Sequence, residues 1–206
     1  ALRKAVEEHN EICRLITEIG EYRKEENPRI TGYEFHVLCV ATYCCPKYLI
    51  LDKLRETAEE LKTREPDQKK NYRAKIVVVG SEMDDPDFTK LIEDSGALVV
   101  ADRFCFGSMP GREEIVLNDE DDVLTQIALH YMKTSQCPRY MSHEKVQERR
   151  DYVKELVDKL EEGVDLAVNG NSVAILSTGD PGFSGVLNTV LRISEEKVYG
   201  NIRKNY

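Results

Sequence analysis

Apolar residues recur at helical spacing through the first third of the chain. The pattern predicts a first helix over about residues 2–24, which Pro28 stops. Further helices are expected over about 32–43 and, after Pro46, as far as about Leu61. The apolar positions near one face of the first helix are Leu2, Val6, Cys13, Ile16 and Ile19. This part of the chain should therefore form a layer of packed helices.

A polar stretch separates these helices from the rest of the chain. Residues 62–73 are highly charged and contain Pro66, a composition typical of an exposed loop or linker. We place a boundary there, between a helical segment at residues 1–65 and an α/β domain at residues 74–206.

After the linker the apolar pattern changes to short, β-branched runs. Residues 74–79 and 97–101 read as buried strands, and between them Asp85 and Pro86 begin a helix that runs to about Asp94. The later pattern predicts helices over about 120–133, 142–162 and 183–193, and strands over 164–168 and 172–177. Strands that alternate with helices indicate an α/β fold, with a parallel sheet flanked by helices.

Composition narrows the choice of partners. The chain has 206 residues, of which 41% are hydrophobic and 33% charged, and its net charge is −9. An acidic balance argues against nucleic acid and against an anionic membrane surface, because both attract Lys and Arg. No apolar run approaches the roughly 20 residues of a membrane helix, and no secretory signal pattern is seen. We therefore expect a folded cytoplasmic protein.

The cysteines also fit a reduced, cytoplasmic protein. A chain of this length can fold without disulfides, and no pair of its cysteines has the C-x-x-C spacing of a zinc ribbon or a thioredoxin. The six cysteines are Cys13, Cys39, Cys44, Cys45, Cys105 and Cys137.

Ligands of parallel sheets bind beyond the carboxyl ends of the strands, and that rule selects the loops at 80–85, 102–108 and 178–182. In the first loop, Gly80 and Ser81 precede a helix N-terminus that could hold an anion through its backbone N–H groups. The alternative is a helix that residues 84 and 85, both Asp, cap by themselves.

The second loop combines a thiol with charged and small residues. Cys105 lies between two aromatic residues and close to Asp102 and Arg103, and a neighbouring Arg can lower the pKa of a thiol. Gly107 and Ser108 would allow a ligand to approach the backbone closely. The alternative for Cys105 is a small buried hydrophobic residue.

Other reactive residue types have simpler interpretations. The adjacent Cys44 and Cys45 fall in a connection between helices, where packing is the expected role. The acidic run at residues 119–122 reads as a solvated loop and helix start, with a metal site as the alternative. The histidines lack partners at ligand spacing and are expected to be structural or exposed, and no metal ligand is assigned. They are His9, His36, His130 and His143.

The order of several motifs resembles the benzoyl-CoA reductase and 2-hydroxyglutaryl-CoA dehydratase family, over about residues 2–165. The motifs are Gly-Ser at 80–81, Asp-Pro-Asp-Phe at 85–88, Leu-Ile-Glu at 91–93, Gly-Ala at 96–97, Ala-Asp-Arg-Phe-Cys-Phe-Gly-Ser at 101–108, Cys-Pro-Arg-Tyr-Met at 137–141 and Glu-Gly-Val-Asp at 162–165. The stretch at 102–108 is closer to the benzoyl-CoA reductase branch than to the dehydratases.

This resemblance implies flavodoxin-like α/β domains, two related subunits, 4Fe–4S clusters bound by cysteines and an ATP-dependent activator protein. The substrate would be an aromatic or 2-hydroxyacyl thioester of CoA, which low-potential electrons convert to a ketyl-type radical. The family's first half, with its cluster cysteines, has no counterpart here, and residues 166–172 replace a Lys-Phe-Cys-Asp stretch that carries another ligand. No cluster ligand is therefore assigned, Cys105 included.

The tail resembles a different family. Residues 173–185 are similar to the Gly-Asp-Pro segment of the tetrapyrrole (precorrin) methyltransferases, which would assign Thr178, Gly179, Asp180 and Pro181 to binding of S-adenosylmethionine. Ordinary turn chemistry at a strand-to-helix connection is the alternative. The two resemblances meet at an irregular junction near residues 165–172.

The leading hypothesis is a subunit or fragment of an iron–sulfur acyl-CoA enzyme that contributes to a thioester site through Gly80, Ser81 and the loop at 102–108. A related second subunit and an activator protein would be its partners. The alternatives are a non-catalytic α/β module or chimera without the cluster site, and a methyltransferase fragment.

Overall fold

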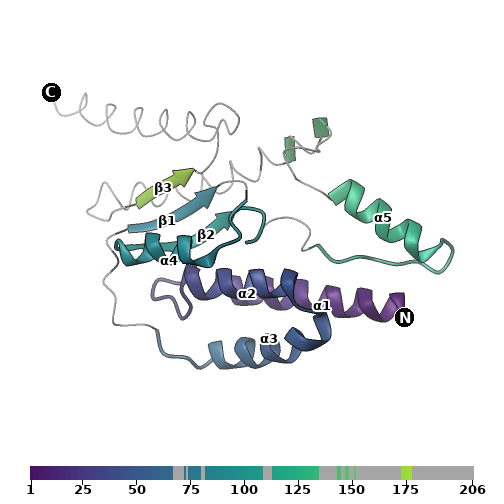
Figure 1. Ribbon diagram of the computed structural model, residues 1–206, viewed down its shortest axis with the longest axis horizontal. Coiled ribbons are helices and arrows are strands. Elements are labelled where there is room, and N and C mark those ends of the chain that lie inside the picture. Colours follow the sequence, from purple (N-terminus) through teal and green to yellow (C-terminus); the bar gives the residue numbers. More distant parts are fainter. Residues whose placement is uncertain are drawn as a thin grey trace.

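The computed structural model describes residues 1–66, 72, 74–79, 82–108, 113–134, 143, 144, 147, 148, 151 and 173–177 (Figure 1). Within these residues the elements are α1 (Leu2–Glu21), α2 (Gly32–Cys44), α3 (Lys47–Leu61), β1 (Ala74–Val79), α4 (Pro86–Asp94), β2 (Ala97–Arg103), α5 (Val123–Thr134) and β3 (Val173–Ser177). Among them no helix has the length and apolar character needed to cross a membrane.

Helices α1, α2 and α3 lie where the sequence predicted helices, and they share one apolar core. Helix α1 packs against α3, and α2 contacts both. Helix α2 begins with a capping box, in which the Thr31 side chain accepts from the Glu34 N–H at 3.1 Å and the Glu34 carboxylate accepts from the Thr31 N–H at 2.8 Å. The core residues are Ile12, Ile16, Ile19, Ile30, Phe35, Cys39, Leu51, Leu54, Ala58 and Leu61.

Strands β1, β2 and β3 form a parallel sheet in the order β2-β1-β3, which confirms the α/β class. Strand β2 is longer than expected. Its last residues, Asp102 and Arg103, pair with Val78 and Val79 of β1, so the prediction that they begin a loop was wrong. The sequence pattern ended the strand at its last apolar residue, whereas backbone pairing continues through two buried polar residues.

Helix α4 connects β1 to β2 and starts as predicted. The Asp85 carboxylate accepts from the Asp87 N–H at 3.0 Å with Pro86 in the first turn, and Gly96, with φ of 98°, makes the turn into β2. A second core forms on the sheet around Ile76, Val78, Met83, Val99 and Phe104.

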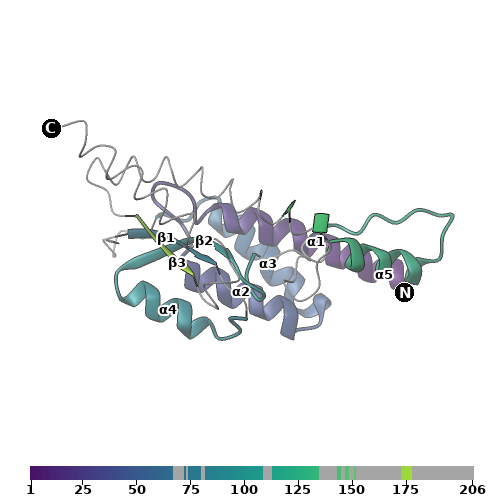
Figure 2. The ribbon, with the colours of Figure 1, turned by 90° about the horizontal axis from the view of Figure 1, so that it is seen from above.

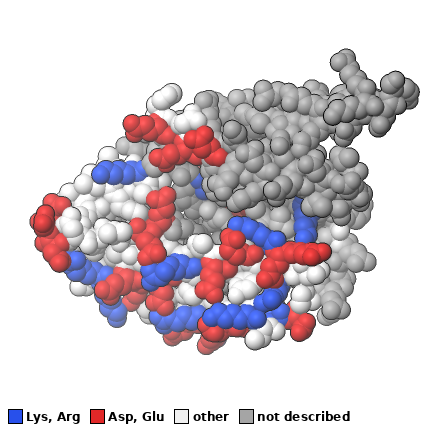
Figure 3. Space-filling view, turned by 180° about the vertical axis from the view of Figure 1, so that it is seen from behind, with Lys and Arg blue, Asp and Glu red and all other residues white. Residues whose placement is uncertain are grey.

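The helical layer lies on one side of the sheet, below it in Figure 1, and α2 packs against α4 and β2. Acidic and basic side chains are interspersed over the face shown in Figure 3. Among the exposed ion pairs of the helical layer, Arg55 of α3 pairs with Glu11 of α1 and with Asp52 of α3. Exposed pairs of this kind each contribute at most about 1 kcal/mol.

In both ribbon views, helix α5 lies near the N-terminal half of α1 (Figure 1 and Figure 2). It begins at Val123 rather than near 120, because the Asp122 carboxylate caps it by accepting from the Thr125 N–H at 3.0 Å. Residues 143, 144, 147, 148 and 151 are helical, within the predicted helix at 142–162. The rest of that helix, the strand predicted at 164–168 and the helix predicted at 183–193 lie outside the described residues.

Gly32, the first residue of α2, gives a test of how closely the helical layer and the sheet approach. A methyl group there would lie 2.5 Å from the Val99 Cβ and 2.7 Å from the Val99 carbonyl oxygen. We expect Gly32→Ala to lower the free energy of unfolding by about 1–3 kcal/mol, the usual cost of overpacking. Urea unfolding would measure the change.

Gly20→Ala is the matched control, because its methyl group would meet the edge of the Phe35 ring at 3.2 Å, within a helix that favours Ala. We expect a near-neutral effect. Equal losses for the two variants would contradict the close approach of α2 to β2.

Candidate functional site

The loop that follows β2 folds back on the end of its own strand. Its turn closes through a hydrogen bond from the Gly107 N–H to the Phe104 carbonyl at 3.2 Å. The Asp102 carboxylate then accepts from the Ser108 N–H at 2.6 Å and from the Ser108 hydroxyl at 2.8 Å. These contacts fix residues 104–108 at the carboxyl end of the sheet, where ligands of parallel sheets bind.

An arginine from the helical layer completes this arrangement. Arg23, just after α1, donates from Nη1 to Asp102 Oδ2 at 2.8 Å and from Nη2 to the Ser108 hydroxyl at 3.0 Å. Its guanidinium lies over the Phe35 ring, 3.7 Å from the centroid, and Nε reaches the Gly20 carbonyl at 3.4 Å. The side chains of Arg23 and Asp102 are only 3% and 1% exposed, so this is a buried ion pair.

Gly107 is required by the same contacts. A methyl group at this position would lie 2.0 Å from Asp102 Oδ1 and 2.7 Å from the Phe104 ring. Because the carboxylate is held by Arg23 and Ser108, it cannot move aside without breaking those hydrogen bonds. The group that approaches the Gly107 backbone closely in the structure is the Asp102 side chain. The predicted close approach of a ligand stays a prediction.

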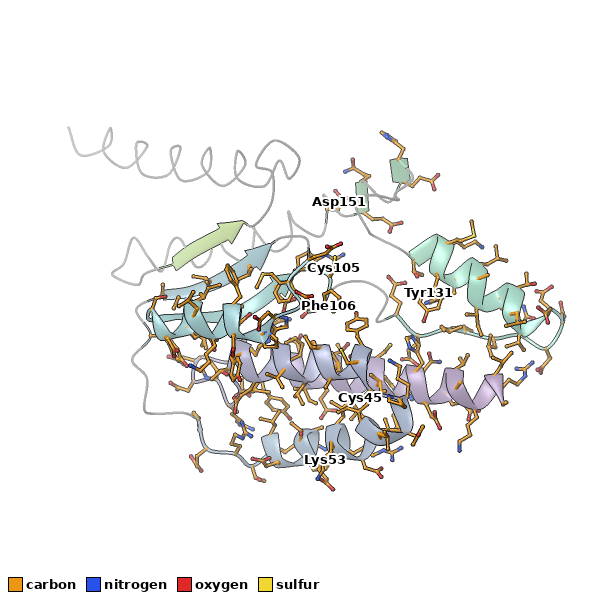
Figure 4. All side chains as sticks on the ribbon, viewed as in Figure 1. Cys45, Lys53, Cys105, Phe106, Tyr131 and Asp151 are labelled. Atoms are coloured by element: carbon orange, nitrogen blue, oxygen red, sulfur yellow. The ribbon has the colours of Figure 1, made fainter. Side chains whose placement is uncertain are left out.

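Cys105 and Phe106 are half-buried, as is Ser108 at the end of the loop. The ring of Phe106 meets the ring of Tyr43 edge-on, with 5.6 Å between centroids. Figure 4 shows Cys105 and Phe106 together beyond the end of β2. Arg103 is buried in the strand, and the arginine that enters the loop's hydrogen-bond network is Arg23, 79 positions away from Asp102.

His36 links the loop to the segment that follows β1. Its Nε2 lies 3.0 Å from the Met83 carbonyl oxygen, which can only accept, so Nε2 carries the proton and donates. Its Nδ1 accepts from the Thr89 hydroxyl at 2.8 Å, and the ring meets Phe104 edge-on at 4.8 Å. Burial lowers the pKa of His36. The expectation of a structural histidine agrees with these contacts.

A buried carboxylate holds the start of α2 on the sheet. Glu93 of α4 is 3% exposed, and its Oε1 accepts from the N–H groups of Gly32 at 2.8 Å and Val99 at 3.2 Å. Its Oε2 accepts from the Tyr33 N–H at 3.1 Å. A negative charge at a helix N-terminus is favourable, because unpaired N–H groups point at it. Sequence reasoning assigned no role to Glu93 or to Arg23.

The first predicted loop is described only from residue 82 onward, and the third lies outside the described residues. Gly80 and Ser81 are outside the described residues, and so are Thr178, Gly179, Asp180 and Pro181, which follow β3. Their assignment to ligand binding stays a prediction.

The cysteines within the described residues do not converge. Cys13 and Cys39 are buried in the helical layer, Cys44 and Cys45 end α2, and Cys105 lies beyond β2. In that part of the chain, no group of three or more His, Cys, Asp or Glu side chains is placed to hold a metal ion. An iron–sulfur cluster requires several convergent thiolates, so these residues do not fit a 4Fe–4S cluster.

The parallel sheet, with the loop after β2 held at a carboxyl strand end by Asp102, defines an α/β protein. The chain belongs to the family of the 2-hydroxyglutaryl-CoA dehydratase D-component, whose family model matches residues 1–169. This match confirms the resemblance to the benzoyl-CoA reductase and 2-hydroxyglutaryl-CoA dehydratase family, and the resemblance of the tail to the methyltransferases stays a prediction. A comparison with curated proteins gave no match.

His36 predicts how stability depends on pH. Because its pKa is lowered from 6.5 in the folded state, the unfolded chain takes up the proton first as the pH falls. The free energy of unfolding should be highest above about pH 6.5 and should fall toward the lower folded-state pKa, by at most about 1.4 kcal/mol per pH unit. Urea unfolding at several pH values from about 5 to about 8, which is about 1.5 units on either side of 6.5, would measure this loss of stability.

His36→Gln should reduce this pH dependence and lower stability at neutral pH by about 1–3 kcal/mol, since buried hydrogen bonds are lost. His143→Gln replaces an exposed histidine and should leave the pH dependence in place. An unchanged slope in His36→Gln would show that other groups cause it.

Proposed function

We propose that this chain is a component of a 2-hydroxyacyl-CoA dehydratase-like or benzoyl-CoA reductase-like enzyme, and that residues 104–108 form part of its thioester site. The family match supports the class of enzyme. The observation that carries the site is the ordered loop at the carboxyl end of β2, held by Asp102 and Arg23. Such a loop is a ready platform for a ligand, because its backbone is fixed before binding.

The chemistry of the loop suits an acyl thioester better than a small free acid. Phe106 and Tyr43 provide aromatic surface, and Tyr43 is 45% exposed. Aromatic and apolar surface beside a few fixed polar groups is typical of sites for organic ligands. An aromatic acyl group would stack on such surface, which supports the benzoyl-CoA reductase-like form of the proposal.

The strand order supports the flavodoxin-like form of the fold. Among the described strands, the order β2-β1-β3 places β1 between the other two. The first strand has the same central place in the flavodoxin-like order 2-1-3-4-5. In that arrangement ligands bind where the strand order reverses, between β1 and β3. The loops with Gly80 and Ser81 and with Thr178–Pro181 follow these two strands, which supports their predicted role in binding.

The proposal includes a related second subunit, an ATP-dependent activator protein and a cytoplasmic location, all of which rest on the family. The 4Fe–4S cluster of such enzymes supplies low-potential electrons, and the described cysteines do not provide its ligands. The part assigned to this chain is therefore to bind and orient the thioester and to keep water from it.

Ligand binding tests the proposal. Benzoyl-CoA or 2-hydroxyglutaryl-CoA should raise the melting temperature of the purified chain, with a stabilisation of about 2.7 kcal/mol at roughly 100 times the Kd. Benzoate and 2-hydroxyglutarate, which lack CoA, should give no shift. Differential scanning fluorimetry with isothermal titration calorimetry measures both effects.

Gly107→Ala should abolish the shift, because the added methyl group displaces the Asp102 carboxylate and opens the loop. Gly32→Ala, whose methyl group would meet Val99 and Glu93 instead, should keep it. The absence of any shift with either thioester in the unaltered chain would overturn the proposal and favour a non-catalytic α/β module.

A further inference from the structure

Arg23 occupies an unusual position in the fold. It follows the last turn of α1, in the helical layer, yet its guanidinium reaches the loop that ends β2. One planar group contacts both the strand end, through Asp102, and the loop end, through Ser108. Asp102 and Ser108 also bond to each other, so the three side chains form a closed hydrogen-bonded triangle.

We infer that Arg23 is a positioning residue that holds the loop at 104–108 in its ligand-competent form; the ligand-binding part of this inference rests on the proposed function. The guanidinium presents its donors in a fixed fork, so it can fix Asp102 and Ser108 relative to each other. Without the guanidinium, the charge of the buried Asp102 carboxylate would lose its partner. The loop would then open, so that water could solvate the carboxylate.

A purely structural role for the ion pair is the competing explanation. In that case a variant would unfold more easily, while the loop of the molecules that remain folded would be unchanged. A matched control is available in Glu93, another buried charge at the same layer boundary. Its hydrogen bonds to the backbone N–H groups of Gly32, Tyr33 and Val99 involve no residue of the loop at 104–108.

Cys105 reports directly on the loop without any ligand. It is half-buried in the loop, whereas Cys44 is exposed at the end of α2 and serves as a reference within the same molecule. The experiment measures the rate of alkylation by iodoacetamide at each cysteine by peptide mass spectrometry, well below the melting temperature of every variant. A ligand titration with benzoyl-CoA and 2-hydroxyglutaryl-CoA accompanies it.

Arg23→Met should accelerate alkylation of Cys105 relative to Cys44 by about tenfold, which corresponds to roughly 1.4 kcal/mol of easier local opening. Because Arg23→Met leaves a buried charge and can prevent folding, Arg23→Met combined with Asp102→Asn removes both charges and should show the same acceleration. Arg23→Lys keeps the charge without the fork and should give an intermediate rate. Glu93→Gln should lower the melting temperature without changing the relative rate.

The outcomes separate the two proposals. Unchanged Cys105 alkylation in the double variant, or an equal acceleration in Glu93→Gln, would overturn the positioning role. Faster alkylation together with about tenfold weaker thioester binding would support both proposals. Faster alkylation in a chain that binds no thioester even when unaltered would support the positioning of the loop and overturn the proposed function.

Discussion

The buried ion pair of Arg23 and Asp102 is the constraint on which the arrangement of this protein depends. Two charges removed from water are tolerated only when each is paired and the remaining hydrogen-bonding capacity is used. Here the pairing is supplied from both sides of the layer boundary, since Arg23 follows α1 and Asp102 ends β2. Ser108 and the ring of Phe35 complete the surroundings of the pair. The helices, the sheet and the loop are thus fixed together by one group of contacts.

Two further buried polar groups repeat this arrangement along α2. Glu93 accepts the N–H groups at its start, and His36, one turn later, donates to the Met83 carbonyl of the segment after β1. Apolar burial drives the layers together but has no preferred direction, whereas each of these hydrogen bonds is satisfied in one register only. The polar contacts therefore account for a single docking of the helices on the sheet.

The parts of the fold that could be predicted are those with local causes. Helical periodicity gave α1, α2 and α3, and the β-branched runs gave β1 and most of β2, because each pattern reflects one buried face. The end of β2 could not be predicted, since Asp102 is buried by a partner 79 positions away. Arg23 and Glu93 look like ordinary charged residues of amphipathic helices, and only the tertiary structure shows that they are buried. A weak signal existed in Thr89 and Glu93, which lie one turn apart on the buried face of α4.

The same network limits what the loop can offer to a ligand. The Asp102 carboxylate already accepts from Arg23 and from both donors of Ser108, and the side chain is 1% exposed. A carboxylate used in this way fixes the backbone and has little capacity left for a substrate. The surface of the loop that remains accessible belongs to Cys105, Phe106 and Ser108, and Phe106 lies beside Tyr43. Recognition at this loop would therefore depend on the shape and aromatic character of an acyl group more than on its charge, which fits a thioester whose carboxylate has been masked by CoA.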